Sequence, residues 1–153
     1  MKTQTAQLRW MIRKDMPQVM TIENGGPGSS IQEEEILGML RNKCTIGMVA
    51  ELGDEVQGYL VYSLESDTLR IERFRVGEPY RRNGIGRLMA EKMASKLEAQ
   101  RRTMIEIDLS ERDIDSQLFF RAMGFKAVQV IHGSYLNGDA AYRFRLSLNE
   151  GCD

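Results

Sequence analysis

The sequence has little cysteine and almost no histidine, which excludes several kinds of site. Among its 153 residues only Cys44 and Cys152 are cysteines, and His132 is the one histidine. Cys152 lies in a polar tail, so no structural disulfide is expected, and the two cysteines suggest a reducing compartment. A single histidine offers too little for a histidine-based metal site or a Ser-His-Asp triad. The sequence therefore predicts no metal site.

The sequence also lacks long apolar runs and a strong excess of one charge. No apolar stretch approaches the roughly 20 residues of a membrane span, and residues 1–5 lack the apolar core of a signal peptide. A cytoplasmic location without a membrane partner is therefore expected. The net charge of −1 argues against general nucleic-acid binding, which usually shows as a basic excess. Locally, however, arginines crowd into one stretch where they could meet phosphate: Arg70, Arg73, Arg75, Arg81, Arg82 and Arg87.

Length and composition predict one globular domain over residues 1–153, with an ordered core over about 6–149. Hydrophobic residues make up 42% and charged residues 28%. Periodicity and turn residues predict the order β-α-α-β-β-β-α-β-α-β-β, an α/β (α+β mixed sheet) fold with one parallel strand–helix–strand crossover. Ser29 or Ser30 is expected to cap the second helix. The expected strands are 8–12, 45–52, 56–64, 69–76, 104–109, 125–131 and 141–148, and the expected helices are 15–23, 31–41, 84–100 and 113–122.

The segment from Arg81 to Gly86 joins the fourth strand to the third helix and has the composition of an anion site. The first turn of a helix has unpaired amide N–H groups and the positive end of the helix dipole. Gly84 and Gly86 lack the Cβ atoms that would keep a phosphate from those amides, and flanking arginines add charge. The pattern G-x-x-x-x-G-K-[ST] is absent, and G-x-G-x-x-G begun at Gly84 fails at Met89. The alternative is that the two glycines only form a turn.

Two segments resemble the GNAT acetyltransferase family. The motif Arg81-x-x-Gly84-x-Gly86 matches the family's [QR]-x-x-G-x-[GA] signature, and residues 116–125 resemble its second conserved block, which ends in Gly-Phe. The resemblance covers nearly all of residues 8–148 and looks most like the RimI-type protein N-terminal acetyltransferases. It implies a GNAT fold whose sheet splays open between the fourth and fifth strands, with acetyl-CoA in that notch. The cofactor-binding residues that it implies are Phe74, Arg75, Val76, Arg81, Arg82, Asn83, Gly84, Ile85, Gly86, Arg87, Asp113 and Phe120.

The resemblance assigns these residues separate roles. Backbone groups of Phe74 and Val76 would pair with pantetheine, and the amides of residues 82–87 would hold the pyrophosphate. Arg73 and Arg75 are unusual beside the cofactor strand, where related sequences are often small or apolar. They are either solvated strand charges or groups that favour an acidic acceptor or the 3′-phosphate of the cofactor.

Several positions depart from the family's pattern. Asp113 stands where the family commonly has an Asn that contacts the cofactor, and a carboxylate does not favour a nearby phosphate. Asp108 stands at the place of a glutamate base, and Phe120 at the place of a tyrosine acid. Tyr135 is the candidate replacement acid, and Glu72 is a second candidate base. The alternatives are that Asp108 caps the next turn, Tyr135 is a half-buried loop aromatic and Glu72 pairs with an arginine.

Acetyl transfer requires a neutral amine, which favours an α-amino group as the acceptor. At pH 7 an α-amine is about 15% neutral and a lysine about 0.04%, so a weak base can still serve an N-terminus. Together with this difference, the resemblance to RimI-type enzymes implies acetylation of a protein or peptide N-terminus. The alternatives are a small amine such as a polyamine or aminoglycoside, an acyl-CoA-binding domain without catalysis, and a nucleic-acid module. Residues 24–30 and 134–139 are expected to shape the acceptor pocket, and the sequence leaves monomer or homodimer open.

Overall fold

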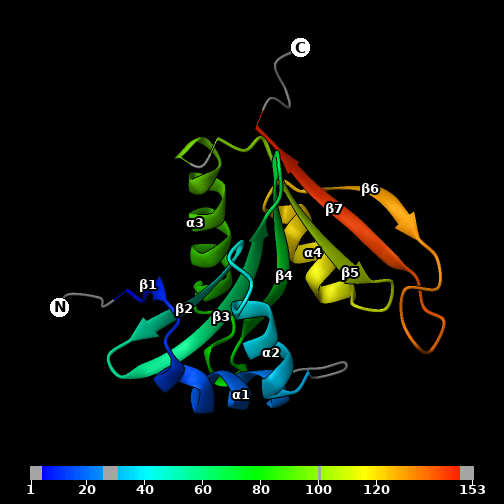
Figure 1. Ribbon diagram of the computed structural model, residues 1–153. Helices are drawn as coiled ribbons and strands as arrows, with labels where there is room; N and C mark the ends of the chain where they lie inside the picture. Colours follow the sequence, from blue (N-terminus) through cyan, green and yellow to red (C-terminus); the bar gives the residue numbers. More distant parts are fainter. Residues whose placement is uncertain (1–4, 26–30, 100, 149–153) are drawn as a thin grey trace. The chain divides into compact units, whose positions relative to one another are not determined.

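The computed structural model describes residues 5–25, 31–99 and 101–148, which form a mixed α/β fold (Figure 1). The strands pair in the order β1-β2-β3-β4-β5-β7-β6 of one mixed sheet. Among the described residues, no helix is both long and apolar enough to cross a bilayer. The strands are β1 (Gln7–Trp10), β2 (Thr45–Leu52), β3 (Glu55–Leu64), β4 (Thr68–Val76), β5 (Met104–Ser110), β6 (Lys126–Ile131) and β7 (Ala141–Ser147). The helices are α1 (Met16–Gly25), α2 (Glu33–Leu40), α3 (Ile85–Ala99) and α4 (Ile114–Ala122), with short 3-10 helices η1 (Arg13–Asp15) and η2 (Glu78–Tyr80).

The predicted order of strands and helices is confirmed, and one predicted helix start is wrong. The second helix begins at Glu33, later than expected, and its N-cap is Gln32. The backbone N–H of Gln32 donates to the carboxylate of Glu35 at 3.2 Å, which is half of a capping box. The expected serine cap is therefore incorrect, and Ser29 and Ser30 lie outside the described residues.

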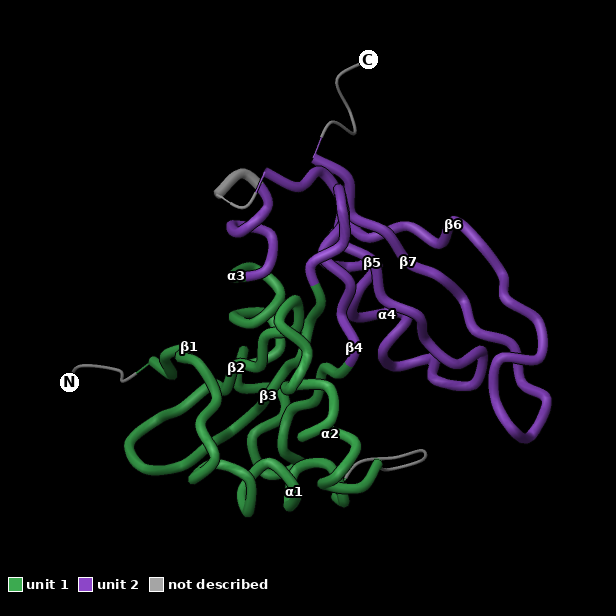
Figure 2. The backbone as a smooth tube through the Cα atoms, in the orientation of Figure 1, with its two compact units in different colours: residues 1–63, 73–92 green, residues 64–72, 93–153 purple. Residues whose placement is uncertain are grey.

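The chain divides into two compact units (Figure 2). Unit 1 consists of residues 1–63 and 73–92, so it contains β1, β2, most of β3, the end of β4 and the start of α3. Unit 2 consists of residues 64–72 and 93–153 and contains the start of β4, the end of α3, and β5, α4, β6 and β7. The single domain expected from the length stays a prediction.

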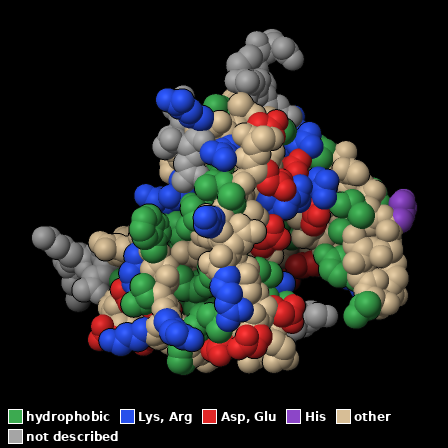
Figure 3. All heavy atoms as spheres, in the orientation of Figure 1, with side chains coloured by type: hydrophobic (Ala, Val, Ile, Leu, Met, Phe, Trp, Pro, Cys, Tyr) green, Lys and Arg blue, Asp and Glu red, His purple; other side chains and the backbone are tan. Residues whose placement is uncertain are grey.

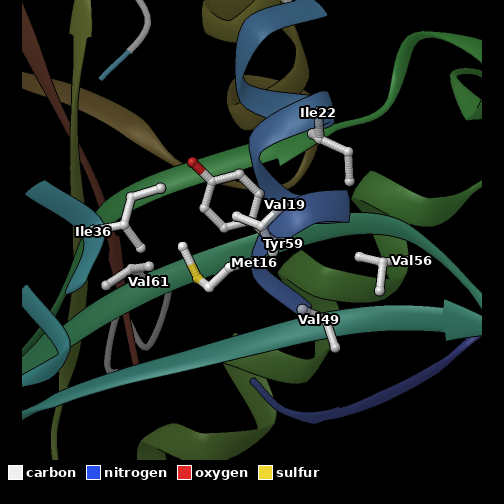
Figure 4. Packing of buried hydrophobic residues seen from close by; sticks show 8 residues of the cluster. All are labelled: Met16, Val19, Ile22, Ile36, Val49, Val56, Tyr59 and Val61. Carbon is white, nitrogen blue, oxygen red and sulfur yellow. The ribbon is translucent and has the colours of Figure 1, made fainter. Parts of the chain in front are cut away.

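The core of unit 1 forms where α1 and α2 pack on β2 and β3 (Figure 4). Met16, Val19 and Ile22 recur every three residues, so they share one face of α1. Burying each such side chain contributes about 1.5–3 kcal/mol relative to leaving it exposed. This packing holds the two helices against the strand that precedes β4 in sequence. The buried cluster consists of Met16, Val19, Ile22, Ile36, Val49, Val56, Tyr59 and Val61.

In unit 2, charged and apolar side chains alternate along β5. Glu106 and Asp108 share one face, because successive residues of a strand point to opposite faces. The antiparallel register with β7 places Arg145 opposite Glu106 and Arg143 opposite Asp108. The parallel ladder of β4 with β5 covers residues 68–71, and the splay beyond it stays a prediction. The apolar face of β5 is buried and consists of Ile105, Ile107 and Leu109.

Candidate functional site

The loop between β4 and α3 is held in place by contacts within unit 1. The N–H of Gly77 donates to the carbonyl of Gln57 at 2.8 Å, and a Cβ on Gly77 would lie 3.0 Å from the ring of Tyr80. The hydroxyl of Tyr80 donates to a carboxylate oxygen of Glu55 at 2.5 Å. That hydrogen bond raises the pKa of Tyr80. The path of the chain into Arg81 is therefore fixed by both packing and hydrogen bonds.

The backbone turns left-handed twice just before α3. Arg82 has a φ of 67° and Gly84 a φ of 82°, and for Arg82 this conformation costs about 1–2 kcal/mol. The N–H of Leu88 makes an i→i−4 hydrogen bond to the carbonyl of Gly84 at 3.0 Å. The amides of residues 85–87 come before this bond, so they have no acceptor within the helix. Left-handed turns followed by a helix N-terminus gather amide N–H groups in the way that anion sites do.

Three exposed arginines flank these amides in the sequence. The Nε of Arg81 donates to the carbonyl of Val76 at 3.4 Å, and Arg87 lies 3.6 Å from Glu91. Both contacts are long, and the second joins two exposed side chains, so it contributes little energy. An incoming phosphate could therefore replace them at small cost. The sequence predicts Arg81, Arg82 and Arg87 at this rim, and all three are exposed. Their contact with a phosphate stays a prediction.

Glu23 forms a buried cluster of ion pairs with Arg73 and Arg75, the residues on either side of Phe74 on β4. The carboxylate of Glu23, which is 0% exposed, accepts hydrogen bonds from Arg73 at 2.6 and 3.3 Å and lies 3.3 Å from Arg75. The hydroxyl of Tyr59 donates to the same carboxylate. These contacts join α1 to β3 and to the end of β4. The interpretation of Arg73 and Arg75 as solvated charges is therefore wrong, and a contact with the cofactor phosphate stays a prediction.

The ionisation of this cluster follows from burial and pairing together. Burial raises the pKa of Glu23, but the hydrogen bonds from Arg73 and Tyr59 and the charges of Arg73 and Arg75 outweigh burial and hold it below its usual range. Burial and the hydrogen bond to Glu23 raise the pKa of Tyr59. For Arg73, burial lowers the pKa, and the interactions with Glu23 and Tyr59 more than reverse this. The cluster is thus a carboxylate held charged between guanidinium groups.

The sequence contains one signal for this cluster, which is the position of Glu23 on α1. Glu23 lies seven residues after Met16, so it falls on the buried face of α1. A carboxylate on an apolar helical stripe is rarely buried without a partner. Arg73 and Arg75 on β4 could have been read as that partner.

In unit 2, the candidate base Asp108 lies in a network of ion pairs. Its two carboxylate oxygens accept hydrogen bonds from Arg143 at 2.9 and 3.1 Å, and a nitrogen of Arg70 lies 3.8 Å away. Glu106, on the same face of β5, accepts hydrogen bonds from Arg70 and Arg145, both at 2.7 Å. Figure 3 shows acidic and basic side chains side by side over this sheet. An amine that approaches Asp108 would therefore compete with Arg143 for hydrogen bonds to its carboxylate oxygens.

The other candidate residues of unit 2 have separate local environments. Glu72 is exposed on β4. Asp113 is the N-cap of α4, where its side chain accepts a hydrogen bond from the N–H of Ser116 at 3.2 Å. Phe120 is buried, and Tyr135 lies exposed on the loop before β7. The ring of Phe120 meets its neighbours Phe119 and Phe125 edge-to-face, with centroids 5.0 and 5.1 Å away.

Comparison of the sequence with protein families gives one match. The profile of the Acetyltransferase (GNAT) family matches residues 7–125. A search of curated proteins finds no significant match.

Comparison of the structure with solved structures shows the same fold in acetyltransferases. The ribosomal-protein-S18-alanine N-acetyltransferase from Escherichia coli is 14% identical, with 94% of each chain covered and a TM-score of 0.84. Ard1 from Thermoplasma volcanium is 22% identical, with 94% of this chain and 98% of that chain covered and a TM-score of 0.86. A GNAT family acetyltransferase from Elizabethkingia anophelis with acetyl-CoA bound is 13% identical, with 95% and 100% covered and a TM-score of 0.78.

Proposed function

The chain belongs to the GNAT acetyltransferase family, and from this premise we propose that it transfers an acetyl group from acetyl-CoA to the α-amino group of a protein or peptide. The proposal has two parts, a cofactor site at the start of α3 and an acceptor with an N-terminal amine. A cytoplasmic location belongs to the same proposal.

The loop before α3 carries the proposal for the cofactor. The pyrophosphate of acetyl-CoA has two negative charges, which suit a helix N-terminus with unpaired amides. Arg82 stays left-handed at a cost in free energy, and strained backbone of this kind is common at ligand sites. The amides of residues 82–87 would hold the pyrophosphate, with Arg81 and Arg87 at its rim. The single observation that carries this assignment is the pair of left-handed residues, Arg82 and Gly84, directly before the amides of α3.

The end of β4 would hold the pantetheine arm. Phe74 and Val76 lie at the end of β4, directly before the loop. Their backbone groups are therefore close in sequence to the proposed pyrophosphate site. Arg75 pairs with Glu23 at 3.3 Å, so a contact with the 3′-phosphate would have to compete with that carboxylate. We therefore propose the backbone of Phe74 and Val76 as the contact, and the side chain of Arg75 as secondary to it.

The reaction needs little from the protein when the acceptor is an α-amine. The neutral nitrogen attacks the thioester carbonyl carbon, the C–S bond breaks, and the sulfur leaves with the electron pair. The nitrogen loses one proton and the thiolate gains one, so the products are an amide and CoA thiol. Deprotonating an α-amine to its neutral form at pH 7 costs about 1 kcal/mol, against about 4–5 kcal/mol for a lysine. An acceptor of the first kind suits a chain in which both oxygens of Asp108 already accept hydrogen bonds.

The residues proposed for proton transfer are Glu72, Asp108 and Tyr135. Glu72 is exposed and Asp108 is partly exposed, so either could reach an amine directly or through water. Tyr135 supplies the hydroxyl that Phe120 lacks, as the proposed proton donor to the leaving sulfur. Replacing Tyr135 by Phe should lower kcat by about tenfold to a hundredfold without lowering Tm, because its side chain is exposed. An unchanged kcat would remove it as the acid.

The acceptor is tested with three substrates that offer different kinds of amine. The first is a peptide with a free N-terminus and no lysine, the second an N-acetylated peptide with one lysine, and the third spermidine. Product masses should show acetylation of the first peptide well above the other two. Acetylation of spermidine alone would replace the proposal with a small-amine acetyltransferase. Binding of acetyl-CoA without turnover on any of the three would indicate a domain that binds the cofactor and does not catalyse.

A further inference from the structure

Unit 1 has an apolar depression that shares no lining residue with the loop before α3. Its volume is about 290 Å³, and it lies where η1 and the start of α1 meet the end of α2. Methionine and leucine side chains are flexible enough to fit apolar groups of different shapes. The apolar lining consists of Met11, Ile12, Met16, Leu37 and Leu40.

One exposed apolar side chain belongs to the depression itself. Ile12 lines it and is 55% exposed, although large apolar side chains are usually covered in a folded domain. Exposed apolar groups beside a hollow mark interaction sites, and arginine is enriched among residues that dominate binding energy.

The rim of the depression is basic. Arg13 and Arg41 both line it, and both are exposed. Arg41 lies 3.9 Å from Glu34, but both side chains are more than 70% exposed, so this pair is worth little. The carboxylate of Asp15, on η1, accepts two hydrogen bonds from Arg9 at 2.8 Å and is therefore occupied. Two further exposed cations follow the rim arginines in sequence: Lys14 and Lys43.

We propose that this surface docks an acidic segment of a partner protein that inserts one apolar side chain between Met16 and Leu40. The hollow accepts the apolar anchor, and Arg13 and Arg41 pair with carboxylates on either side of it. Electrostatic complementarity of this kind sets partner choice and speeds association. In Figure 3, hydrophobic and basic side chains lie together over the region of β1 and α2. The site is separate from the proposed cofactor loop, so docking and acetyl transfer can be measured independently.

The test is isothermal titration calorimetry with a short acidic peptide. The probe is the peptide Asp-Glu-Leu-Phe-Asp-Glu, acetylated at its N-terminus so that it cannot serve as an α-amine acceptor. Titrating it into the protein at low salt should give a binding signal that saturates. Replacing its four acids with lysine should abolish binding, and replacing Leu-Phe with Ser-Ser should weaken binding by about tenfold.

Matched variants place the interaction on this surface. The double variant Arg13→Glu/Arg41→Glu should weaken binding of the acidic peptide by at least about tenfold. Arg121→Glu, an exposed arginine on α4, has the same change of charge per site and should leave binding unchanged. Circular dichroism checks that both variants fold. Equal binding by the double variant, no binding by the wild-type protein at about 1 mM peptide, or tighter binding of oligo(dT) than of the peptide would overturn the proposal.

Discussion

Replacing Glu23 with Gln should destabilise the protein more than any other change of one carboxylate to its amide. The variant keeps the shape of the side chain but leaves Arg73 and Arg75 without their shared countercharge. These two arginine side chains are only 19% and 18% exposed, and removing one partner of a buried pair costs about 3–5 kcal/mol. Because the arginines keep some contact with water, we expect the lower end, about 3 kcal/mol. For a chain of this length the loss corresponds to a decrease in Tm of about 6–12 °C.

The assay is urea unfolding followed by far-ultraviolet circular dichroism, with three comparisons. Glu91→Gln removes an exposed carboxylate 3.6 Å from Arg87 and should cost less than about 0.5 kcal/mol. Adding Arg73→Met to Glu23→Gln should cost less than the sum of the two single changes, by about 1–3 kcal/mol. Because the folded protein lowers the pKa of Glu23, its contribution is present above about pH 4.5 and is lost as the pH falls further. A loss below 1 kcal/mol for Glu23→Gln would refute the reasoning.

Three further predictions concern the cofactor loop, the candidate bases and acid stability. Gly84→Ala adds a Cβ that meets nothing within 4 Å, but it places alanine at a φ of 82°. The variant should therefore lose about 1–2 kcal/mol of stability. It should also bind acetyl-CoA about tenfold more weakly in calorimetry, because the added Cβ would crowd the phosphate at the amides. Asp108→Asn and Glu72→Gln, made separately, should lower kcat/KM by about a hundredfold for the true base, and unchanged rates at both would remove both. Asp15→Asn should lower the free energy of unfolding by about 1–2 kcal/mol at pH 7. The hydrogen bond from Arg9 lowers the pKa of Asp15, so the wild-type protein loses this contribution as the pH falls below about 3.8. The variant should lose less stability over the same pH range.

The sequence predicts elements well where the determinants are local. The strand over 45–52 matches exactly because Gly53 and Asp54 end it in a tight turn, and Gly53 adopts a φ of 63°. The loop before α3 could be found for the same reason, since its glycines and arginines are adjacent in sequence. The start of α2 differs from the prediction because Gln32 with Glu35 caps the helix, whereas serine is the commoner N-cap residue.

Contacts between distant residues could not be read from the sequence alone. Arg73 lies 50 residues from Glu23, and only the packing of α1 on β3 brings them together. Arg143 lies 35 residues from Asp108, and the β5–β7 register decides that they face each other. The charge pattern of each strand was visible, but the partner of each charge depends on strand order and register. For this reason the loop before α3 could be located from the sequence, whereas the partners of Arg73 and Asp108 could not.

The central claim is the acetyl-CoA site at Arg82 and Gly84, and thermal unfolding with acetyl-CoA tests it most directly. A ligand at a hundred times its dissociation constant adds about 2.7 kcal/mol, or about 5–10 °C in Tm for a chain of this length. We predict a rise of that size for acetyl-CoA, with smaller rises for dephospho-CoA and ATP at the same concentration. No rise at millimolar acetyl-CoA would contradict the claim, and the two left-handed residues would then be an ordinary turn before a helix.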